Sequence, residues 1–195
     1  MLPFDSSIAL KLIAAFFIGS IPFAILAMMG TGIDIRQVGS GNPGFNNVLR
    51  VDKTRAILTL IGDMGKGFLA VWLLQGPGEP QAFAWLYGFM AVFGHCYSPF
   101  LKFNGGKGIA TSAGVMLILY PAWAALAIGF FVLVRLTGSR LRWKEAGMIA
   151  SISTWLFFAV LMFVLIGDIA GRNALLMTLF LAWRHQQNFR NLFVT

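Results

Sequence analysis

Long runs of apolar residues alternate along the chain with short polar segments rich in glycine, asparagine and basic residues. A helix needs about 20 mainly apolar residues to cross the hydrocarbon core of a membrane. The runs therefore predict an all-α, polytopic membrane protein with about seven transmembrane helices, some of them short. These helices are expected at Ser7–Gly30, Arg55–Gln75, Gln81–Ser98, Ile109–Tyr120, Pro121–Leu136, Ala146–Ile166 and Ile169–Trp183. Because no linker rich in proline, glycine or serine separates them, we expect a single integral-membrane domain over residues 1–195.

The stretch 108–136 decides how many helices cross, because it is long for one span and short for two full ones. A single crossing would place the basic segment Arg135–Lys144 outside, against the tendency of lysine and arginine to lie on the cytoplasmic side. We therefore expect two short helices, with Pro121 at the first position of the second, where its missing N–H costs little. This arrangement places the N-terminus outside, the C-terminus in the cytoplasm, and most basic residues at the cytoplasmic face.

The composition supports this class and narrows the partners. Hydrophobic residues make up 58% of the chain and charged residues only 11%, whereas soluble domains average about 25% charged residues. The net charge of +8 predicts basic cytoplasmic loops together with a site for an anion. Because the cations lie between apolar segments, we expect no nucleic-acid partner. Two histidines, one cysteine and no metal-binding motif lead us to expect no metal and no cofactor.

The first polar loop, Gly39–Arg50, is rich in groups that bind anions. Glycine lets backbone N–H groups approach a ligand closely, and successive N–H groups form an anion-binding concavity. Arg50 adds a guanidinium group whose shape fits a phosphate. The candidate substrate- or phosphate-binding residues here are Ser40, Gly41, Asn42, Gly44, Asn46, Asn47 and Arg50. The alternative is an ordinary turn-rich loop in which Arg50 only marks the cytoplasmic side.

Two charged residues, Asp63 and Lys66, interrupt an apolar span. Their spacing of three puts them on one face of a helix. An ionisable residue in a membrane helix costs about 2.5–3.5 kcal/mol on insertion scales and by default marks function. Both residues are therefore candidates for the binding site, and the alternative is an ion pair that satisfies itself and orients the helix. The neighbouring Gly65 and Gly67 permit close approach of another helix or a ligand.

The third polar cluster, Gly94–Thr111, contains a glycine turn and a lysine directly before a predicted helix. Backbone N–H groups at a helix N-terminus attract anions, and Lys107 is placed beside them. The candidate binding residues here are His95, Gly105, Gly106, Lys107, Gly108 and Thr111. The alternative is a loop that ends a helix and carries a lysine that marks the topology.

Two more basic segments follow. Arg135–Lys144 suits contact with anionic lipid headgroups. The segment Arg184–Arg190 contains His185 and Asn188, which would share one face if it is helical. These two residues are candidates for catalysis, and the alternative is a solvated tail.

Taken together and in this order, the motifs resemble those of the acyl-phosphate:glycerol-3-phosphate acyltransferases of bacterial membranes, from about Gly19 to Arg190. The matching motifs are Ser40–Arg50, Asp63–Gly67, Gly94–Thr111 and Arg184–Asn188. The chain departs from the family pattern at Phe45–Asn46 (Ala-Thr in the family), at Lys144–Glu145 (often a serine) and at Asn191 (usually arginine).

The resemblance implies that a fatty acyl group moves from acyl phosphate to the 1-hydroxyl of sn-glycerol 3-phosphate. The products are 1-acyl-glycerol 3-phosphate (lysophosphatidate) and phosphate, at the start of phospholipid synthesis. The implied partners are these two substrates and membrane lipid, at a site that faces the cytoplasm from the bacterial cytoplasmic (inner) membrane. His185, Lys107 and Asn188 are the expected catalytic residues, and Arg50 and Lys66 add cations for the phosphates. The oligomeric state stays open, with a monomer among the options.

The acceptor hydroxyl must lose a proton as it attacks, and three groups are candidates to take it. They are His185, His95 and a phosphate oxygen of the substrate. An unperturbed histidine pKa of about 6.5 suits a base near neutral pH. We favour the substrate oxygen, with His185 orienting the reactants, because the donor already carries a good leaving group. Two other functions compete: a small-anion or phosphate-ester transporter, since broken helices with charged residues also suit transporters, and a lipid-binding paralogue that has lost activity.

Overall fold

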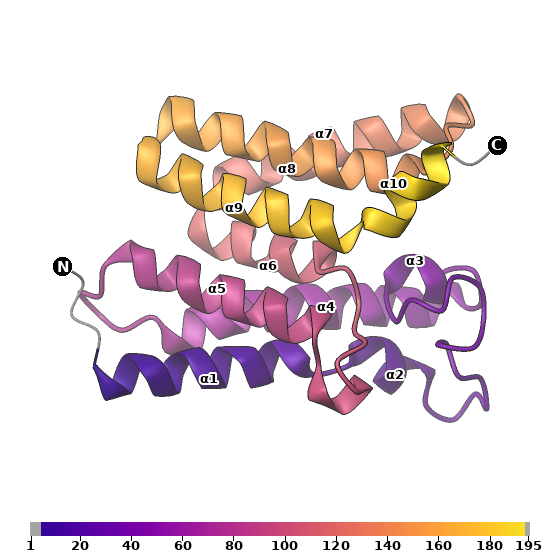
Figure 1. Ribbon diagram of the computed structural model, residues 1–195, viewed down its shortest axis with the longest axis horizontal. Coiled ribbons are helices and arrows are strands. Elements are labelled where there is room, and N and C mark those ends of the chain that lie inside the picture. The colour runs from indigo at the N-terminus through magenta and orange to yellow at the C-terminus, as the bar shows by residue number, and fades with distance from the viewer. Residues whose placement is uncertain (1–4, 194–195) are drawn as a thin grey trace. The chain divides into compact units, whose positions relative to one another are not determined.

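A computed structural model describes residues 5–193, and all regular structure in this part of the chain is helical, as the apolar pattern predicted. The helices divide after Leu119 into two compact units, one running through the indigo and magenta part of Figure 1 and the other ending in yellow. Two such units can form one domain or two, so the single domain over residues 1–195 stays a prediction.

From residue 5 to Leu119, the first unit contains six α-helices and one short 3₁₀ helix. They are α1 (Ser6–Ser20), α2 (Phe23–Met28), α3 (Phe45–Val48), α4 (Lys53–Leu74), α5 (Gln81–Cys96), η1 (Pro99–Leu101) and α6 (Ile109–Leu119). Side-chain caps mark two of the starts, since the carboxylate of Asp5 accepts from the first turn of α1 and that of Asp52 accepts from the N–H of Arg55 in α4. Helix α1 packs on α5, and α4 packs on α6.

The span expected at Ser7–Gly30 is broken, which corrects the prediction of one continuous helix. Helix α1 ends at Ser20 and α2 begins at Phe23, because Pro22 has no N–H to continue the helical hydrogen bonds. The break is tolerated because side chains satisfy the carbonyl groups that it exposes. The hydroxyl of Ser98 donates to the Ser20 carbonyl at 2.7 Å, and Lys66 Nζ donates to the Ile21 carbonyl at 2.7 Å.

Glycines allow these helices to cross with their backbones almost in contact. A Cβ atom added to Gly19 of α1 would lie 1.9 Å from the carbonyl oxygen of Ala91 in α5. A Cβ added to Gly67 of α4 would lie 2.0 Å from the carbonyl oxygen of Thr111 in α6. Small residues at membrane helix crossings commonly serve this purpose. The close approach expected at Gly67 is therefore confirmed, and it is made to another helix.

The second unit contains α7 (Pro121–Arg140), α8 (Ala146–Leu165), α9 (Asp168–Arg184) and α10 (Gln186–Phe193). Helix α8 packs against both α7 and α9. The predicted break at Pro121 is confirmed, with the proline at the start of α7, but α7 continues past the expected end at Leu136 to Arg140. The rings of Phe130 and Phe157 stack between α7 and α8 with centroids 4.6 Å apart.

Within residues 5–193, four helical segments are long and apolar enough to cross a membrane: Ser6–Met28, Lys53–Leu74, Pro121–Arg140 and Ala146–Leu165. The other expected spans are shorter, with 16 residues in α5, 17 in α9 and 11 in α6. At 1.5 Å per residue, 16 residues reach about 24 Å, less than the hydrocarbon thickness of about 30 Å. The helical membrane class is thus confirmed, whereas the count of seven spans and the orientation of the termini stay predictions.

Candidate active site

A buried cluster of three ionisable side chains joins α4 and α5 in the first unit. Lys66 Nζ lies 2.8 Å from Asp63 Oδ1, and His95 Nδ1 lies 3.4 Å from the same oxygen. Each of the three side chains is at most 6% exposed. Lys66 Nζ also lies 5.8 Å from the centre of the Phe23 ring, within reach of a cation–π contact. Asp63 and Lys66 thus share one face of the helix, as predicted, and they form the ion pair that was the alternative to a binding role. His95 extends this cluster to the end of α5.

The glycine turn before α6 is pressed against the end of α5 by backbone contacts. The N–H groups of Gly105 and Gly106 donate to the carbonyls of Cys96 and His95 at 3.1 and 3.2 Å. A Cβ on Gly105 would lie 2.0 Å from the His95 carbonyl oxygen, and one on Gly106 would lie 2.2 Å from His95 Nε2. A side chain at position 105 would collide with the backbone of α5, and one at position 106 would have to displace the His95 ring.

Asn47 holds the first polar loop from inside. Its Nδ2 donates to the carbonyls of Ile35 and Val38, both at 2.9 Å, and its Oδ1 accepts from the N–H of Ser40 at 3.0 Å. The residue is 1% exposed. Because the loop backbone uses both ends of the amide, Asn47 shapes the loop, although the sequence analysis had placed it among the substrate-binding candidates.

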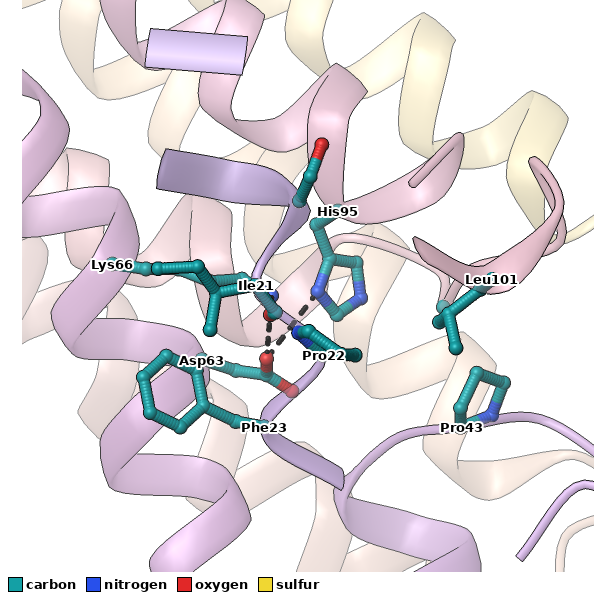
Figure 2. A pocket seen from close by; sticks show the side chains of 10 residues that line it. Ile21, Pro22, Phe23, Pro43, Asp63, Lys66, His95 and Leu101 are labelled. Atoms are coloured by element: carbon teal, nitrogen blue, oxygen red, sulfur yellow. Dashed lines mark hydrogen bonds and ion pairs between the residues drawn. The ribbon is translucent and has the colours of Figure 1, made fainter. Parts of the chain in front are cut away.

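A small cavity brings the first loop, the glycine turn and the ionisable cluster together within the first unit. Figure 2 shows Asp63, Lys66 and His95 on one side of it, and Pro43 of the first loop facing Leu101 on another. Gly106 also lines it. Three motifs that are far apart in the sequence therefore meet at one cavity.

The other candidates in this unit differ in exposure. Arg50 is exposed, and its Nη1 lies 3.5 Å from where a Cβ of Gly39 would stand, so the guanidinium group lies over the turn at the start of the loop. Lys107 is half-buried. Ser40 and Asn46 are exposed, Gly41 and Asn42 are half-buried, and Gly44, Gly105, Gly106 and Gly108 are buried. Thr111 is fully buried in the crossing of α4 and α6, and its hydroxyl has no hydrogen-bond partner among the described residues.

In the second unit, His185 lies at the junction of α9 and α10. It is 4% exposed, and its Nδ1 lies 2.8 Å from the carbonyl oxygen of Leu181. A carbonyl oxygen only accepts hydrogen bonds, so Nδ1 carries the proton and, in the neutral ring, Nε2 holds the lone pair. Helix α9 ends at Arg184 and α10 begins at Gln186. His185 and Asn188 therefore do not lie in one continuous helix, which corrects the picture of a single shared face.

Glu145 was not among the candidates predicted from the sequence, but it contacts the candidate Asn188. Its Oε2 accepts from Asn188 Nδ2 at 2.6 Å, and its Oε1 accepts from Asn191 Nδ2 at 2.8 Å. The signal was indirect: Glu145 and Asn191 were both noted as departures from a family pattern, but nothing in the sequence linked one to the other.

The sequence pattern of a known family, described as glycerol-3-phosphate acyltransferase, matches residues 9–195 of this chain. The chain belongs to the glycerol-3-phosphate acyltransferase family. A glycerol-3-phosphate acyltransferase of Laribacter hongkongensis is 40% identical over 190 residues, covering 93% of this chain and 90% of that protein. Glycerol-3-phosphate acyltransferase 1 of Deinococcus radiodurans is 42% identical over 185 residues, covering 94% of this chain and 90% of that protein.

A solved structure agrees with this membership in the glycerol-3-phosphate acyltransferase family. The crystal structure of PlsY (YgiH), an integral membrane glycerol 3-phosphate acyltransferase in its glycerol 3-phosphate form, matches with a TM-score of 0.85. The two chains are 29% identical, and the match covers 96% of this chain and 92% of that one. The family resemblance drawn from the four motifs is therefore confirmed.

Proposed function

We propose that this protein transfers a fatty acyl group from acyl phosphate to the 1-hydroxyl of sn-glycerol 3-phosphate. The products are lysophosphatidate and inorganic phosphate. The observation that carries the proposal is membership in the glycerol-3-phosphate acyltransferase family over residues 9–195. The half-buried Lys107 beside the glycine turn supports it, because both substrates carry a phosphate that a lysine would bind.

Within this proposal, the candidates of the first unit divide into two kinds. The exposed or half-buried side chains of Ser40, Arg50 and Lys107 bind phosphate. The buried Asp63, Lys66 and His95 support the loops from beneath, since their charges are matched within the protein. Asn47 and Thr111 belong with them, because one shapes the first loop and the other packs in a helix crossing.

The transfer step follows from the chemistry of the two substrates. The 1-hydroxyl oxygen of glycerol 3-phosphate attacks the acyl carbonyl carbon, and the bond from that carbon to the phosphate oxygen breaks. We assign the hydroxyl proton to a phosphate oxygen, whose second pKa lies near 6 by analogy with phosphoserine. Lys107 and Arg50 stabilise the charge that develops on the phosphate. His185, with its ring held by Leu181, orients the acceptor together with Asn188.

The proposed location is the bacterial cytoplasmic membrane, with seven spans, the N-terminus outside and the phosphate-binding loops at the cytoplasmic face. Large apolar side chains such as Leu10, Ile61 and Val164 are more than 60% exposed, which suits contact with lipid. A fatty chain could then reach the site from the lipid, while the water-soluble acceptor arrives from the cytoplasm.

The test is to incubate the purified protein in detergent with palmitoyl phosphate and glycerol 3-phosphate, and to measure lysophosphatidate and phosphate. We expect both products in equal amounts, and phosphate release that depends on glycerol 3-phosphate. The protein with Lys107 replaced by alanine is the matched control. A transporter or an inactive lipid-binding paralogue would form no lysophosphatidate, and that result would reject the proposal.

A further inference from the structure

Glu145 joins two parts of the second unit through one carboxylate. The residue precedes α8, and its carbonyl oxygen accepts from the N–H groups of Met148 and Ile149 at 2.9 and 3.1 Å. Its side chain binds Asn188 and Asn191, which lie three residues apart on one face of α10. The residue adopts a φ of 59°, a left-handed conformation that side chains with a Cβ atom rarely take. Glu145 is thus fixed at its backbone and at both carboxylate oxygens.

The chemistry of this contact determines which way the Asn188 amide points. An ionised carboxylate can only accept hydrogen bonds, and an asparagine amide has one donating end and one accepting end. Amide orientation follows from the hydrogen-bond network, so the NH₂ ends of Asn188 and Asn191 must both face Glu145. The carbonyl oxygen Oδ1 of Asn188 is then turned away from the carboxylate. Asn188 Nδ2 lies 2.6 Å from the carboxylate oxygen Oε2 of Glu145.

We propose that Glu145 is a positioning residue that holds the Asn188 amide in this orientation, so that Oδ1 accepts a hydrogen bond from a hydroxyl group of glycerol 3-phosphate. The inference rests on the proposed function, which gives Asn188 its place beside the acceptor. The inference adds Glu145 to the residues on which acceptor binding depends, and it gives the direction of the hydrogen bond between Asn188 and the acceptor. The acceptor is recognised at this point as a hydrogen-bond donor, and the recognition depends on a carboxylate that follows Lys144 in an otherwise basic loop.

Asn191 offers a matched control, because it binds the same carboxylate and is not placed in the proposed machinery. Replacing Asn191 by alanine removes one hydrogen bond to Glu145 and leaves the other one to Asn188. Replacing Glu145 by alanine also removes the hydrogen bond to Asn188. If Glu145 only ties α10 to the loop before α8, Asn191→Ala should also lower the affinity or turnover for the acceptor, because it removes one of the two bonds of that tie. If Glu145 orients Asn188, only the second variant should lose affinity or turnover for the acceptor.

The test is a double-mutant cycle in detergent with palmitoyl phosphate and glycerol 3-phosphate, using Glu145→Ala, Asn188→Ala and the double variant. We expect Glu145→Ala to lower kcat/KM for glycerol 3-phosphate by about 10-fold or more, the size of one lost hydrogen bond to a charged group. Asn191→Ala should change it less than about 3-fold, and KM for palmitoyl phosphate should stay within about 2-fold in both. The double variant should be no slower than Asn188→Ala alone, because residues that act through one another are not additive.

Three results would overturn the inference: equal losses in Glu145→Ala and Asn191→Ala, additive losses in the cycle, or wild-type kinetics in Glu145→Ala. If Glu145→Ala does not purify as a folded protein, Glu145→Gln replaces it, because glutamine keeps the volume and offers only one acceptor oxygen for two amides. A smaller loss that again disappears in the Asn188→Ala background supports the inference, and an additive one rejects it. If the wild-type protein forms no lysophosphatidate, the proposed function itself fails, so the two failures are distinguishable.

Discussion

Three basic side chains of the first unit differ in burial, and this difference separates their expected roles. Lys66 is buried against Asp63, whereas Arg50 is exposed and Lys107 is half-buried. We predict that Arg50→Ala and Lys107→Ala each lower turnover by at least about 10²-fold, because losing one charge-stabilising contact costs about 2.7–4 kcal/mol at comparable sites. Phosphate release from palmitoyl phosphate in the presence of glycerol 3-phosphate measures the effect.

Lys102 provides the control for this pair, because it is an exposed lysine in the loop that carries Lys107. We expect Lys102→Ala to retain normal turnover. All three variants should unfold at nearly the wild-type temperature. If Arg50→Ala or Lys107→Ala turns over at the normal rate, that cation serves only the membrane topology.

Replacing His185, which follows α9, tests which group accepts the proton of the acceptor hydroxyl. The Nδ1–H of His185 is committed to Leu181, so only Nε2 can accept a proton from substrate. If a phosphate oxygen takes the proton, we predict that His185→Asn slows the reaction less than about 10-fold and leaves the acidic limb of the pH–rate profile in place. A histidine base would instead give a loss of about 10²–10⁴-fold with that limb removed, and this result would replace the substrate route.

At the scale of single helices, two glycines of α4 make a matched pair. A Cβ on Gly67 would lie 2.0 Å from the backbone oxygen of Thr111, whereas a Cβ on Gly65 meets no atom within 4 Å. Overpacking typically costs about 1–3 kcal/mol, and about 1 kcal/mol shifts the Tm of a chain of this size by roughly 2–4 °C. We predict that Gly67→Ala lowers the Tm in detergent by several degrees. Gly65→Ala should leave it unchanged or raise it, and equal effects would contradict the close crossing.

The loop between α4 and α5 is tied to α1 by an ion pair between Lys11 and Glu79. The hydrogen bond from Lys11 lowers the pKa of Glu79 below its ordinary value of 4.5. A carboxylate with a lowered pKa stabilises the fold above its unfolded pKa, and this contribution disappears as the pH falls through the folded pKa. We predict that Glu79→Gln is less stable than the wild type at pH 7, and that the difference shrinks below about pH 4.5.

Thermal unfolding in detergent at a series of pH values measures this effect. Asp168→Asn is the control, because the pair of Asp168 with Arg172 is more than two-thirds exposed on both sides, and such surface pairs contribute little. A constant difference between Glu79→Gln and wild type at every pH would mean that the contact acts through packing and not through charge.

The helices also show what a sequence can and cannot predict. The break at Pro121 was predictable because the apolar stretch around it had the wrong length for one span and was followed by basic residues. The break at Pro22 was missed because the apolar run continues on both sides, and α2 has only six residues. What holds that break open is contact with Ser98 and Lys66, which are distant in sequence. A local pattern carries no information about such contacts.

For the molecule as a whole, the motifs indicated the family and the segments that form the site. They did not indicate which of their residues bind substrate and which stabilise the loops. Asp63, Lys66 and Asn47 were expected to bind substrate, and the structure places each in contacts within the protein. Residue type and spacing cannot distinguish a buried polar group that faces a ligand from one that supports the loop beneath it. Glu145 was missed for a related reason. It contacts Asn188, which is 43 residues away, and no helical periodicity links two positions so far apart.

The last prediction concerns how the chain is threaded through the membrane. If the seven-span arrangement is right, the loop before α5 lies outside and the end of α7 lies in the cytoplasm. A cysteine in place of Pro77 should then react with a membrane-impermeant reagent added to intact cells, and one in place of Ser139 should react only after the cells are opened. Pro77 is preferable to the adjacent Gly78, whose φ of 76° would strain a cysteine, and both chosen positions are exposed.

The unaltered protein is the control for this labelling, because its one cysteine, Cys96, is fully buried and should not react. Reaction at Ser139 in intact cells would place the basic segment at the end of α7 outside. That result would reduce 108–136 to a single crossing despite the break at Pro121, and it would also separate this segment from the cytoplasmic pool of glycerol 3-phosphate. Protection of Pro77 in intact cells would reverse the orientation of α4 and α5. Either outcome would contradict the proposed cytoplasmic site, because that site depends on the orientation of these loops.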